Sequence, residues 1–205
     1  SFPTRRSSDL FYRIATIVLF TSILLITYSV YEIYSSKNKV NQNLEVWNDN
    51  NIIKDNTNHT FTEKSPKVRN YDKTGKFEIL GKLTIVKTKN VFPIIQGTTD
   101  EDLKNGAGHY LESVLPGKSG NCIIFGHRDG VFKKLEDVKV GDTILVETNL
   151  GKFIYKITNL KITSLKESEI IKYYKEPMLT LVTCYPFNYI GSAPKRFLVT
   201  GKLQM

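Results

Sequence analysis

The sequence predicts an all-β domain, built as an antiparallel barrel or sandwich, that follows an N-terminal membrane helix. Three observations support this prediction. From Phe77 onward, short runs of apolar and β-branched residues alternate with Gly, Asn, Asp and Pro. Helical candidates in the same region are few and short. Ahead of it, residues 14–30 carry no charged side chain and reach the length that a helix needs to cross a hydrocarbon core.

The N-terminal residues divide into a short leader and an apolar stretch. Residues 1–10, SFPTRRSSDL, lack an initiator methionine and read like a translated sequencing adapter, so we expect them to be a non-native scar. Residues 11–34 are apolar, aromatic or small hydroxyl types, broken only by Arg13 and Glu32. Because no small-x-small cleavage site follows, these residues predict a transmembrane anchor and not a cleaved signal peptide.

Residues 35–75 are rich in Asn, Lys, Asp, Ser and Thr and show no sustained hydrophobic period. Such a segment cannot bury enough apolar surface to fold alone, so we expect a polar linker. One apolar island within it is a candidate for packing on the domain as a short helix. The island comprises Leu44, Val46, Trp47, Ile52 and Ile53.

Residues 76–205 form the predicted globular domain. Seven closely spaced runs have strand composition, which favours a barrel or sandwich. The runs are FEILGKLTIVK, VFPIIQG, GNCIIFGH, DTILVETN, KFIYKITNLKIT, MLTLVTC and RFLVTGKL. Short helices are predicted from Thr99 to Lys104, from Phe132 to Val138 and from Lys166 to Tyr173.

Composition limits the partners. The chain carries 29 Lys and Arg against 20 Asp and Glu, a formal charge of +9, so nucleic acid and an anionic membrane or wall surface are candidate partners, although most of this charge is expected to be a solvated surface. The basic residues form no arginine-rich run or nucleic-acid motif, so no nucleic-acid partner is predicted. Two cysteines are too few for a disulfide framework, which favours a free thiol. Without zinc spacing or a Gly-rich phosphate loop, we predict no metal and no cofactor.

Three reactive side chains stand at the ends of predicted strands. Cys184 ends the run MLTLVT just before Tyr-Pro, where a thiol can face a cleft. His127 follows NCIIFG in a glycine-flanked turn, and its ring suits acid or base chemistry near neutral pH. Arg196 begins the next strand twelve residues after Cys184, so antiparallel pairing would bring them side by side. A guanidinium there favours the thiolate and stabilises a developing oxyanion.

Each of these residues also has a structural alternative. Free cysteines are often buried, and a histidine or arginine at a strand end is often only solvated. His109 is expected to have a packing and hydrogen-bonding role, and Arg128 is an alternative to Arg196 because it adjoins the histidine turn. Together the three positions nevertheless offer a nucleophile, a proton carrier and an oxyanion donor.

The residues around these positions resemble the sortase family. TLVTC at 180–184 is followed by Tyr-Pro-Phe, by Ala-Pro-Lys-Arg at 193–196 and then by Phe-Leu-Val. GNCIIFGHRDG, which ends at Gly130, is similar to the strand and turn of the family histidine, and AGHYLES before it also fits. The resemblance covers Phe77 to Met205, and the Tyr-Pro-Phe and Ala-Pro elements resemble class D sortases.

The resemblance implies an eight-stranded β-barrel with a few short helices, held outside a Gram-positive cell by a single-pass membrane anchor. It also implies a cysteine transpeptidase that cleaves Leu-Pro-x-Thr type sorting signals of surface proteins and attaches these proteins to the cell wall. Cys184 would form a thioester, His127 would shuttle the proton between the leaving amine and an amine nucleophile such as a wall precursor, and Arg196 would hold the oxyanion. Val182 and Thr183 are expected to line the substrate groove.

Two other functions compete with transpeptidation. A cysteine hydrolase would use the same three residues and release its product to water. The order of histidine before cysteine excludes a papain-like arrangement, and the caspase signature is absent. A non-catalytic, membrane-tethered β module would instead join Cys122 to Cys184 in a disulfide. Otherwise Cys122 is expected to fill the core.

Overall fold

The computed structural model describes residues 6–55, 78–164, 170–189 and 191–204. The chain divides into two compact units, Ser1–Asn38 and Lys39–Met205. In chain order the elements are α1 (Arg6–Asp55), β1 (Ile79–Ile85), β2 (Asn90–Gln96), α2 (Asp100–Asn105), β3 (Ala107–His109), β4 (Gly120–Phe125), the 3-10 helix η1 (Lys133–Asp137), β5 (Thr143–Thr148), β6 (Gly151–Thr163), β7 (Pro177–Tyr185) and β8 (Lys195–Leu203).

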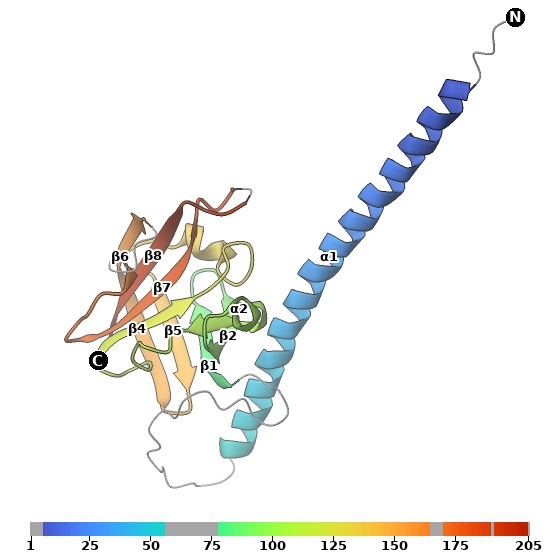
Figure 1. The fold of residues 1–205 in the computed structure, drawn as a ribbon. Helices are drawn as coiled ribbons and strands as arrows, with labels where there is room; N and C mark the ends of the chain where they lie inside the picture. Colours follow the sequence, from blue (N-terminus) through green and yellow to red (C-terminus); the bar gives the residue numbers. More distant parts are fainter. Residues whose placement is uncertain (1–5, 56–77, 165–169, 190, 205) are drawn as a thin grey trace, which may run out of the picture. The chain divides into compact units, whose positions relative to one another are not determined.

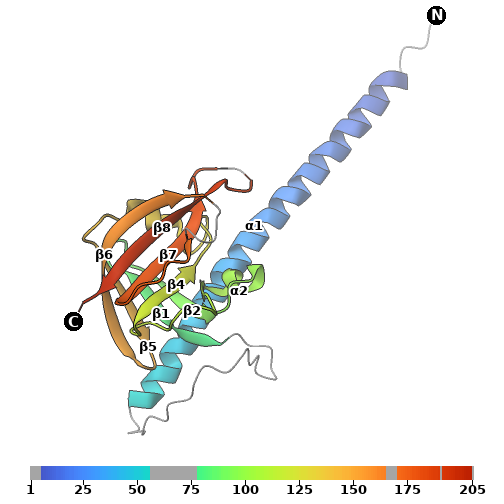
Figure 2. The same ribbon diagram turned by 60° about the vertical axis from the view of Figure 1, so that its left-hand side comes forward.

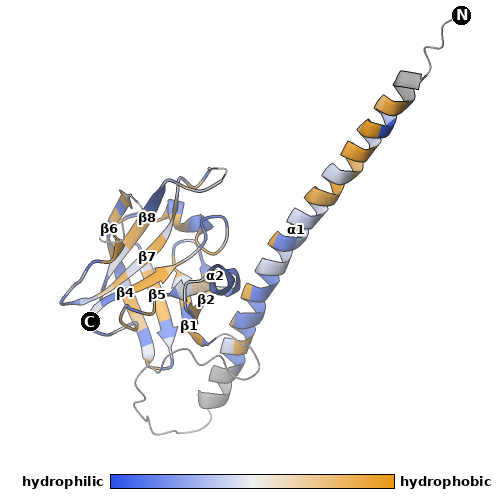
Figure 3. Ribbon diagram, in the orientation of Figure 1, coloured by the Kyte–Doolittle hydropathy of each residue, from blue (hydrophilic) through white to orange (hydrophobic). Residues whose placement is uncertain are grey.

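The first unit consists of the N-terminal part of α1. An 18-residue window within Leu10–Asp49 has a mean hydropathy of 2.0 and is long and apolar enough to cross a membrane. Figure 3 shows the hydrophobic residues of α1 concentrated toward its N-terminal half. Hydroxyl groups in this stretch bond to carbonyls three or four residues earlier, so their polar atoms are satisfied within the helix. The pairs are Thr16 to Arg13, Thr21 and Ser22 to Val18, Thr27 to Leu24 and Ser29 to Leu25.

Helix α1 continues beyond residue 34, the predicted end of the anchor, as far as Asp55. Residues 35–55, predicted as the first part of the polar linker, are therefore helical. Trp47 of the apolar island is only 6% exposed, and it lies on α1 and not on a separate short helix. The remainder of the predicted linker lies outside the described residues, as do residues 166–169 of the helix predicted from Lys166 to Tyr173. The described residues 171–173 of that prediction are not helical.

Eight strands of the second unit close into one barrel in the order β1-β2-β3-β4-β7-β8-β6-β5 (Figures 1 and 2). Strand β1 pairs with both β2 and β5, which closes the sheet. The eight-stranded barrel with a few short helices is thus confirmed. Seven strands coincide with the predicted runs, whereas the three-residue β3 is too short to show a hydrophobic period.

Pairing is antiparallel except between β2 and β3 and between β4 and β7. Parallel neighbours require a crossover connection. Helix α2 lies in the crossover between β2 and β3, and η1, β5 and β6 lie between β4 and β7 along the chain. Because parallel strands end at the same edge of a sheet, the C-terminal ends of β4 and β7 meet.

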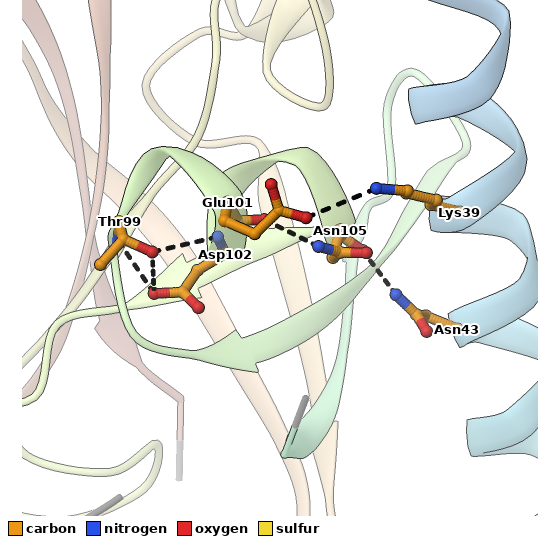
Figure 4. Close-up of polar contacts among 6 residues, drawn as sticks. All are labelled: Lys39, Asn43, Thr99, Glu101, Asp102 and Asn105. Carbon is orange, nitrogen blue, oxygen red and sulfur yellow. Dashed lines mark hydrogen bonds and ion pairs between the residues drawn. The ribbon is translucent and has the colours of Figure 1, made fainter. Parts of the chain in front are cut away.

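Helix α2 begins with the cap predicted at Thr99. The Thr99 hydroxyl accepts a hydrogen bond from the backbone N–H of Asp102 at 3.2 Å, and the Asp102 carboxylate accepts one from the backbone N–H of Thr99 at 2.9 Å (Figure 4). These reciprocal bonds form a capping box that satisfies two otherwise unpaired donors. They fix the point at which the crossover becomes helical.

The part of α1 that belongs to the second unit packs on the barrel beside α2. Figure 4 shows Lys39 paired with Glu101 at 3.4 Å and the Asn43 side chain donating to the carbonyl of Asn105 at 3.0 Å. Val40 packs against the hydrophobic core, and Trp47 is buried. The folded domain therefore includes helical residues that lie well before β1.

Side chains of β7 alternate between two faces of the sheet, as strand geometry requires. Leu179 and Leu181 belong to the main core inside the barrel. Val182 faces the other way, and Cys184, two residues further on, shares its face. A second, smaller cluster covers this outer face. It contains Ile123, Ile170, Val182 and Leu198.

Candidate active site

Cys184 and Arg196 lie directly opposite each other on the antiparallel strands β7 and β8. Both residues are half-buried. The Arg196 guanidinium donates from Nη1 to the carbonyls of Ala193, at 3.4 Å, and Lys195, at 3.1 Å. The side-by-side placement expected from the twelve-residue spacing is thus observed in the strand register.

His127 is placed by the parallel pair of β4 and β7. Phe125 and Val182 are the last partners in the register. One residue further on, the backbone N–H of Gly126 donates to the carbonyl of Val182 at 3.1 Å, and the Thr183 hydroxyl donates to the carbonyl of Gly126 at 2.8 Å. His127 therefore follows this register at the same edge of the sheet as the residue after Thr183, which is the candidate nucleophile.

Tight packing fixes the backbone of the histidine turn. The carbonyl of His127 accepts hydrogen bonds from the N–H groups of Gly130, at 3.2 Å, and Phe132, at 3.0 Å. Phe132 is fully buried, and a Cβ atom at position 126 would lie 2.5 Å from its ring. Glycine before the histidine is thus required by the close approach of Phe132.

The side chains of His127 and Cys184 are both partly exposed. Among the described residues, neither side chain has a hydrogen-bond partner, and both residues are half-buried. A thiolate is the attacking form of cysteine, and an imidazolium is its natural counterpart as proton donor. The arrangement can therefore support covalent catalysis with an arginine beside the nucleophile.

The two predicted substrate-lining residues lie in different surroundings. Val182 is fully buried in the outer cluster, next to Cys184 along the same face of β7. A small hollow of about 20 Å³ lies along this face beside Ile170, Thr180 and Leu198. Thr183 is 2% exposed, and its hydroxyl is bound to Gly126. The valine is thus buried within the outer cluster, whereas the threonine joins β7 to the residue that follows β4.

The contacts of Arg128 were not predicted from the sequence. It donates from Nη1 to the carbonyl of Pro186 at 2.9 Å and from Nη2 to the carbonyls of Tyr189 and Gly191, the last at 2.9 Å. Its guanidinium also lies 5.7 Å from the centre of the Tyr189 ring. The sequence had offered this arginine only as an alternative to Arg196, because no motif marks a residue that binds backbone carbonyls.

Cys122 is fully buried inside the barrel and is a free thiol, as is Cys184. Burial raises the pKa of the Cys122 thiol. Its partner in the β4–β7 register is Leu179, five residues from Cys184, a separation of about 16 Å along a strand. A disulfide requires Cα atoms within about 7 Å, so the disulfide considered for a non-catalytic module does not fit this fold.

His109 is buried and has the hydrogen-bonding role predicted for it. Its Nδ1 lies 3.1 Å from the Gln96 side-chain oxygen, and its Nε2 lies 3.1 Å from the carbonyl of Val114 and 3.2 Å from the Ser113 hydroxyl. Burial lowers the pKa of His109 more than the Val114 carbonyl raises it. Within the described ranges, no three His, Cys, Asp or Glu side chains form a group that could hold a metal ion.

Comparisons with known proteins agree with this geometry. The sequence model of the sortase domain matches residues 83–204. Sortase D of Bacillus subtilis (strain 168) is 39% identical over 123 residues, which are 60% of this chain and 62% of that protein. The solved catalytic domain of B. anthracis SrtD is 34% identical, with a TM-score of 0.55, over 71% of this chain and 97% of its own. A Clostridium perfringens Sortase D5 transpeptidase shares the fold, with a TM-score of 0.59 at 23% identity, over 83% of this chain and 98% of its own.

The fold and the site define a closed β-barrel with a thiol, an imidazole and a guanidinium at the ends of neighbouring strands. Because the sortase domain model matches more than half of the chain, the chain belongs to the sortase family, whose members are cysteine transpeptidases. The match spans 62% of the length of sortase D of B. subtilis and 61% of that of sortase A of Bacillus anthracis.

Proposed function

We propose that this chain is a class D cysteine transpeptidase that cleaves a Leu-Pro-x-Thr type sorting signal and transfers the acyl part to an amine. The observation that carries the proposal is the register of β7 with both of its neighbours. Cys184 faces Arg196 on β8, while His127 follows the parallel register of β4. The register of these strands therefore supports a common site for the three residues at one end of the barrel.

The first half-reaction forms a thioester. The Cys184 thiolate attacks the carbonyl carbon of the signal's threonine, and Arg196 stabilises the oxyanion that develops. The bond to the departing amine breaks, and the His127 imidazolium gives that amine its proton. The acyl group then remains on the sulfur of Cys184.

The second half-reaction releases the acyl group. An incoming amine attacks the thioester carbon, the neutral His127 imidazole takes its proton, and the thiolate leaves. The histidine therefore returns to its charged form, ready for another cycle. A surface protein would in this way become joined to an amine of a cell-wall precursor.

The peptide site is proposed along the outer face of β7 and the adjoining strands. Val182 is fully buried beneath this face and supports the apolar cluster beside the thiol, a setting that suits the leucine and proline of the signal. Thr183 acts indirectly, through its bond to Gly126.

The location is proposed to be the cell membrane, with a single span and the catalytic domain outside a Gram-positive cell. Support comes from the long apolar stretch of α1 and from membership of a family that attaches surface proteins. The excess of basic residues suits an anionic membrane or wall surface.

Intact-mass measurement on the full chain in detergent micelles tests the proposal. The chain, its Cys184→Ala form and its Cys122→Ala form are each mixed with Leu-Pro-x-Thr peptides. An acyl adduct on the unaltered chain and on Cys122→Ala, but not on Cys184→Ala, is the expected result. Absence of an adduct across a varied peptide set overturns it.

Added amine separates transfer from hydrolysis. A transpeptidase converts the peptide to an amide product that carries the added amine, in proportion to its concentration. A hydrolase gives the free acid at every amine concentration. The second result would assign the same three residues to a cysteine hydrolase.

A further inference from the structure

We propose that Arg128 is a positioning residue that holds the loop between Cys184 and Arg196 against the turn after His127, and so fixes the spacing of the three reactive groups. This inference rests on the proposed function. It concerns the connection from β7 to β8, residues 186–194, which only Tyr185 separates from the candidate nucleophile and only Lys195 separates from the candidate oxyanion donor.

The two ends of this loop are anchored by their own contacts. Near the start, the ring of Phe187 packs edge-on against Phe197, at 5.5 Å between centroids, and against Tyr185, at 6.1 Å. Near the end, Arg196 binds the carbonyls of Ala193 and Lys195. The arginine of the candidate site is thus itself bound to the loop.

The middle of the loop is bound to Arg128. The Arg128 guanidinium donates hydrogen bonds to three backbone carbonyls, those of Pro186, Tyr189 and Gly191. It also lies near the ring of Tyr189. Charged donors make hydrogen bonds about twice as strong as neutral ones. Since these acceptors belong to the backbone, the contact controls the path of the loop and not merely a side-chain orientation.

Arg128, which makes these contacts, directly follows His127 in the chain. The backbone of His127 is fixed by Gly130 and Phe132, and Arg128 is the next residue along this turn. A rigid turn that carries the imidazole is therefore bound to the loop that carries the thiol and the guanidinium at its ends. Small displacements of reacting groups cost about 100-fold in rate per ångström in unfavourable cases.

The number and geometry of the acceptors require arginine. A guanidinium presents five donors in a planar fork, whereas a lysine ammonium is a compact point charge with three. Arg128→Lys keeps the charge but cannot reach three carbonyls spread over six residues of the loop. A role of charge alone would survive this substitution, and a positioning role would not.

The test compares Arg128→Lys and Arg128→Gln with the unaltered full chain in detergent micelles. A matched control is Lys134→Ala, which removes a positive charge from the nearby helix η1, where Lys134 pairs with Asp137 and not with the loop. Two quantities are measured. One is the single-turnover rate of thioester formation at saturating Leu-Pro-x-Thr peptide, and the other is hydrogen exchange of the amides between Cys184 and Arg196.

Both Arg128 variants are expected to exchange faster in this loop and to form the thioester about 10- to 100-fold more slowly. The peptide concentration at half-maximal rate is expected to change less than about twofold, because Arg128 binds backbone of the protein and not the peptide. Lys134→Ala is expected to match the unaltered chain in both measurements. Retained exchange protection in β4 and β7 shows that a variant is folded, and if Arg128→Gln unfolds, Arg128→Lys decides.

A normal rate in Arg128→Lys, or unchanged loop exchange in both variants, overturns the positioning role while the proposed function stands. An unaltered chain that forms no thioester with any peptide overturns the proposed function, and the positioning role with it. The two failures are thus distinct.

Discussion

The hydroxyl of Thr183 donates a 2.8 Å hydrogen bond to the carbonyl of Gly126, and this contact extends the pairing of β4 with β7 to the residues just before the candidate proton carrier and the candidate nucleophile. Both residues are buried. Each is followed directly by a reactive residue, Cys184 in one case and His127 in the other. The bond therefore helps to fix the positions of Cys184 and His127 relative to each other along the paired strands.

Replacing Thr183 by valine tests this bond. Valine keeps the shape but removes the donor, so the free energy of unfolding should fall by about 1 to 3 kcal/mol. Urea unfolding of the full chain in micelles measures the change. Thr183→Ser, which keeps a hydroxyl, is the control and should retain the rate of thioester formation that valine loses. Equal rates in the two variants would contradict a positioning effect of this bond.

Glycine 126 is expected to be intolerant of a side chain. A Cβ atom there would meet Phe132 at 2.5 Å and Val131 at 2.7 Å, and relieving such an overlap costs about 1 to 3 kcal/mol. Gly126→Ala should therefore unfold at lower urea concentration. The matched control is Gly130→Ala, because a Cβ at that position of the same turn has no neighbour closer than 3.5 Å. Similar losses in both variants would refute the packing argument.

His109 predicts a dependence of stability on pH. Burial lowers its pKa below the usual value of about 6.5, so the unfolded chain binds its proton first as the pH falls. The stability that comes from neutral His109 is thus complete above about pH 6.5 and is lost as the pH falls through the lower, folded-state pKa. Urea midpoints at pH 7.5, 6.5 and 5.5 should decline more steeply for the unaltered chain than for His109→Gln. Parallel curves would show that another group is responsible.

Trp47 is expected to stabilise the catalytic domain, although it precedes the first strand by about thirty residues. It is 6% exposed, and replacing a buried aromatic residue by alanine costs about 3 to 5 kcal/mol. The neighbouring Val46 is 44% exposed, so Val46→Ala should cost little. Urea unfolding of the two variants, followed by hydrogen exchange in the barrel strands, checks the difference. No loss in Trp47→Ala would mean that the burial of this side chain does not stabilise the domain.

The strands were predictable wherever their hydrophobic pattern extended over several residues. The runs that end in Phe125, Cys184 and Leu203 alternate or remain apolar long enough to show their type. Strand β3 was not predictable, because the three residues from Ala107 to His109 are too few to show a hydrophobic period, although they pair with both β2 and β4. The helical state of residues 35–55 was likewise hidden, since their stability comes from packing such as that of Trp47 and not from a visible apolar stripe.

The sequence predicted the reactive residues of the candidate site but not the hydrogen bonds that position them. Cys184, His127 and Arg196 can be recognised in the sequence because each lies at the end of a predicted strand or in the turn beside it. The bonds that hold them, from Thr183 to Gly126 and from Arg128 to the β7–β8 loop, depend on a parallel register between strands far apart in sequence. No local pattern encodes such a register.

The parallel pairing of β4 with β7 also has a kinetic consequence. His127 and Cys184 are separated by 57 residues, and β8, which carries Arg196, is the last of the described strands. Contacts between distant segments form slowly, because a long intervening chain must first be ordered. A nascent chain that ends before β8 holds the thiol without the guanidinium. The candidate site is therefore complete only once β8 has paired with β7 and β6 and the barrel has closed, so that a chain without β8 holds the candidate nucleophile without its neighbouring arginine.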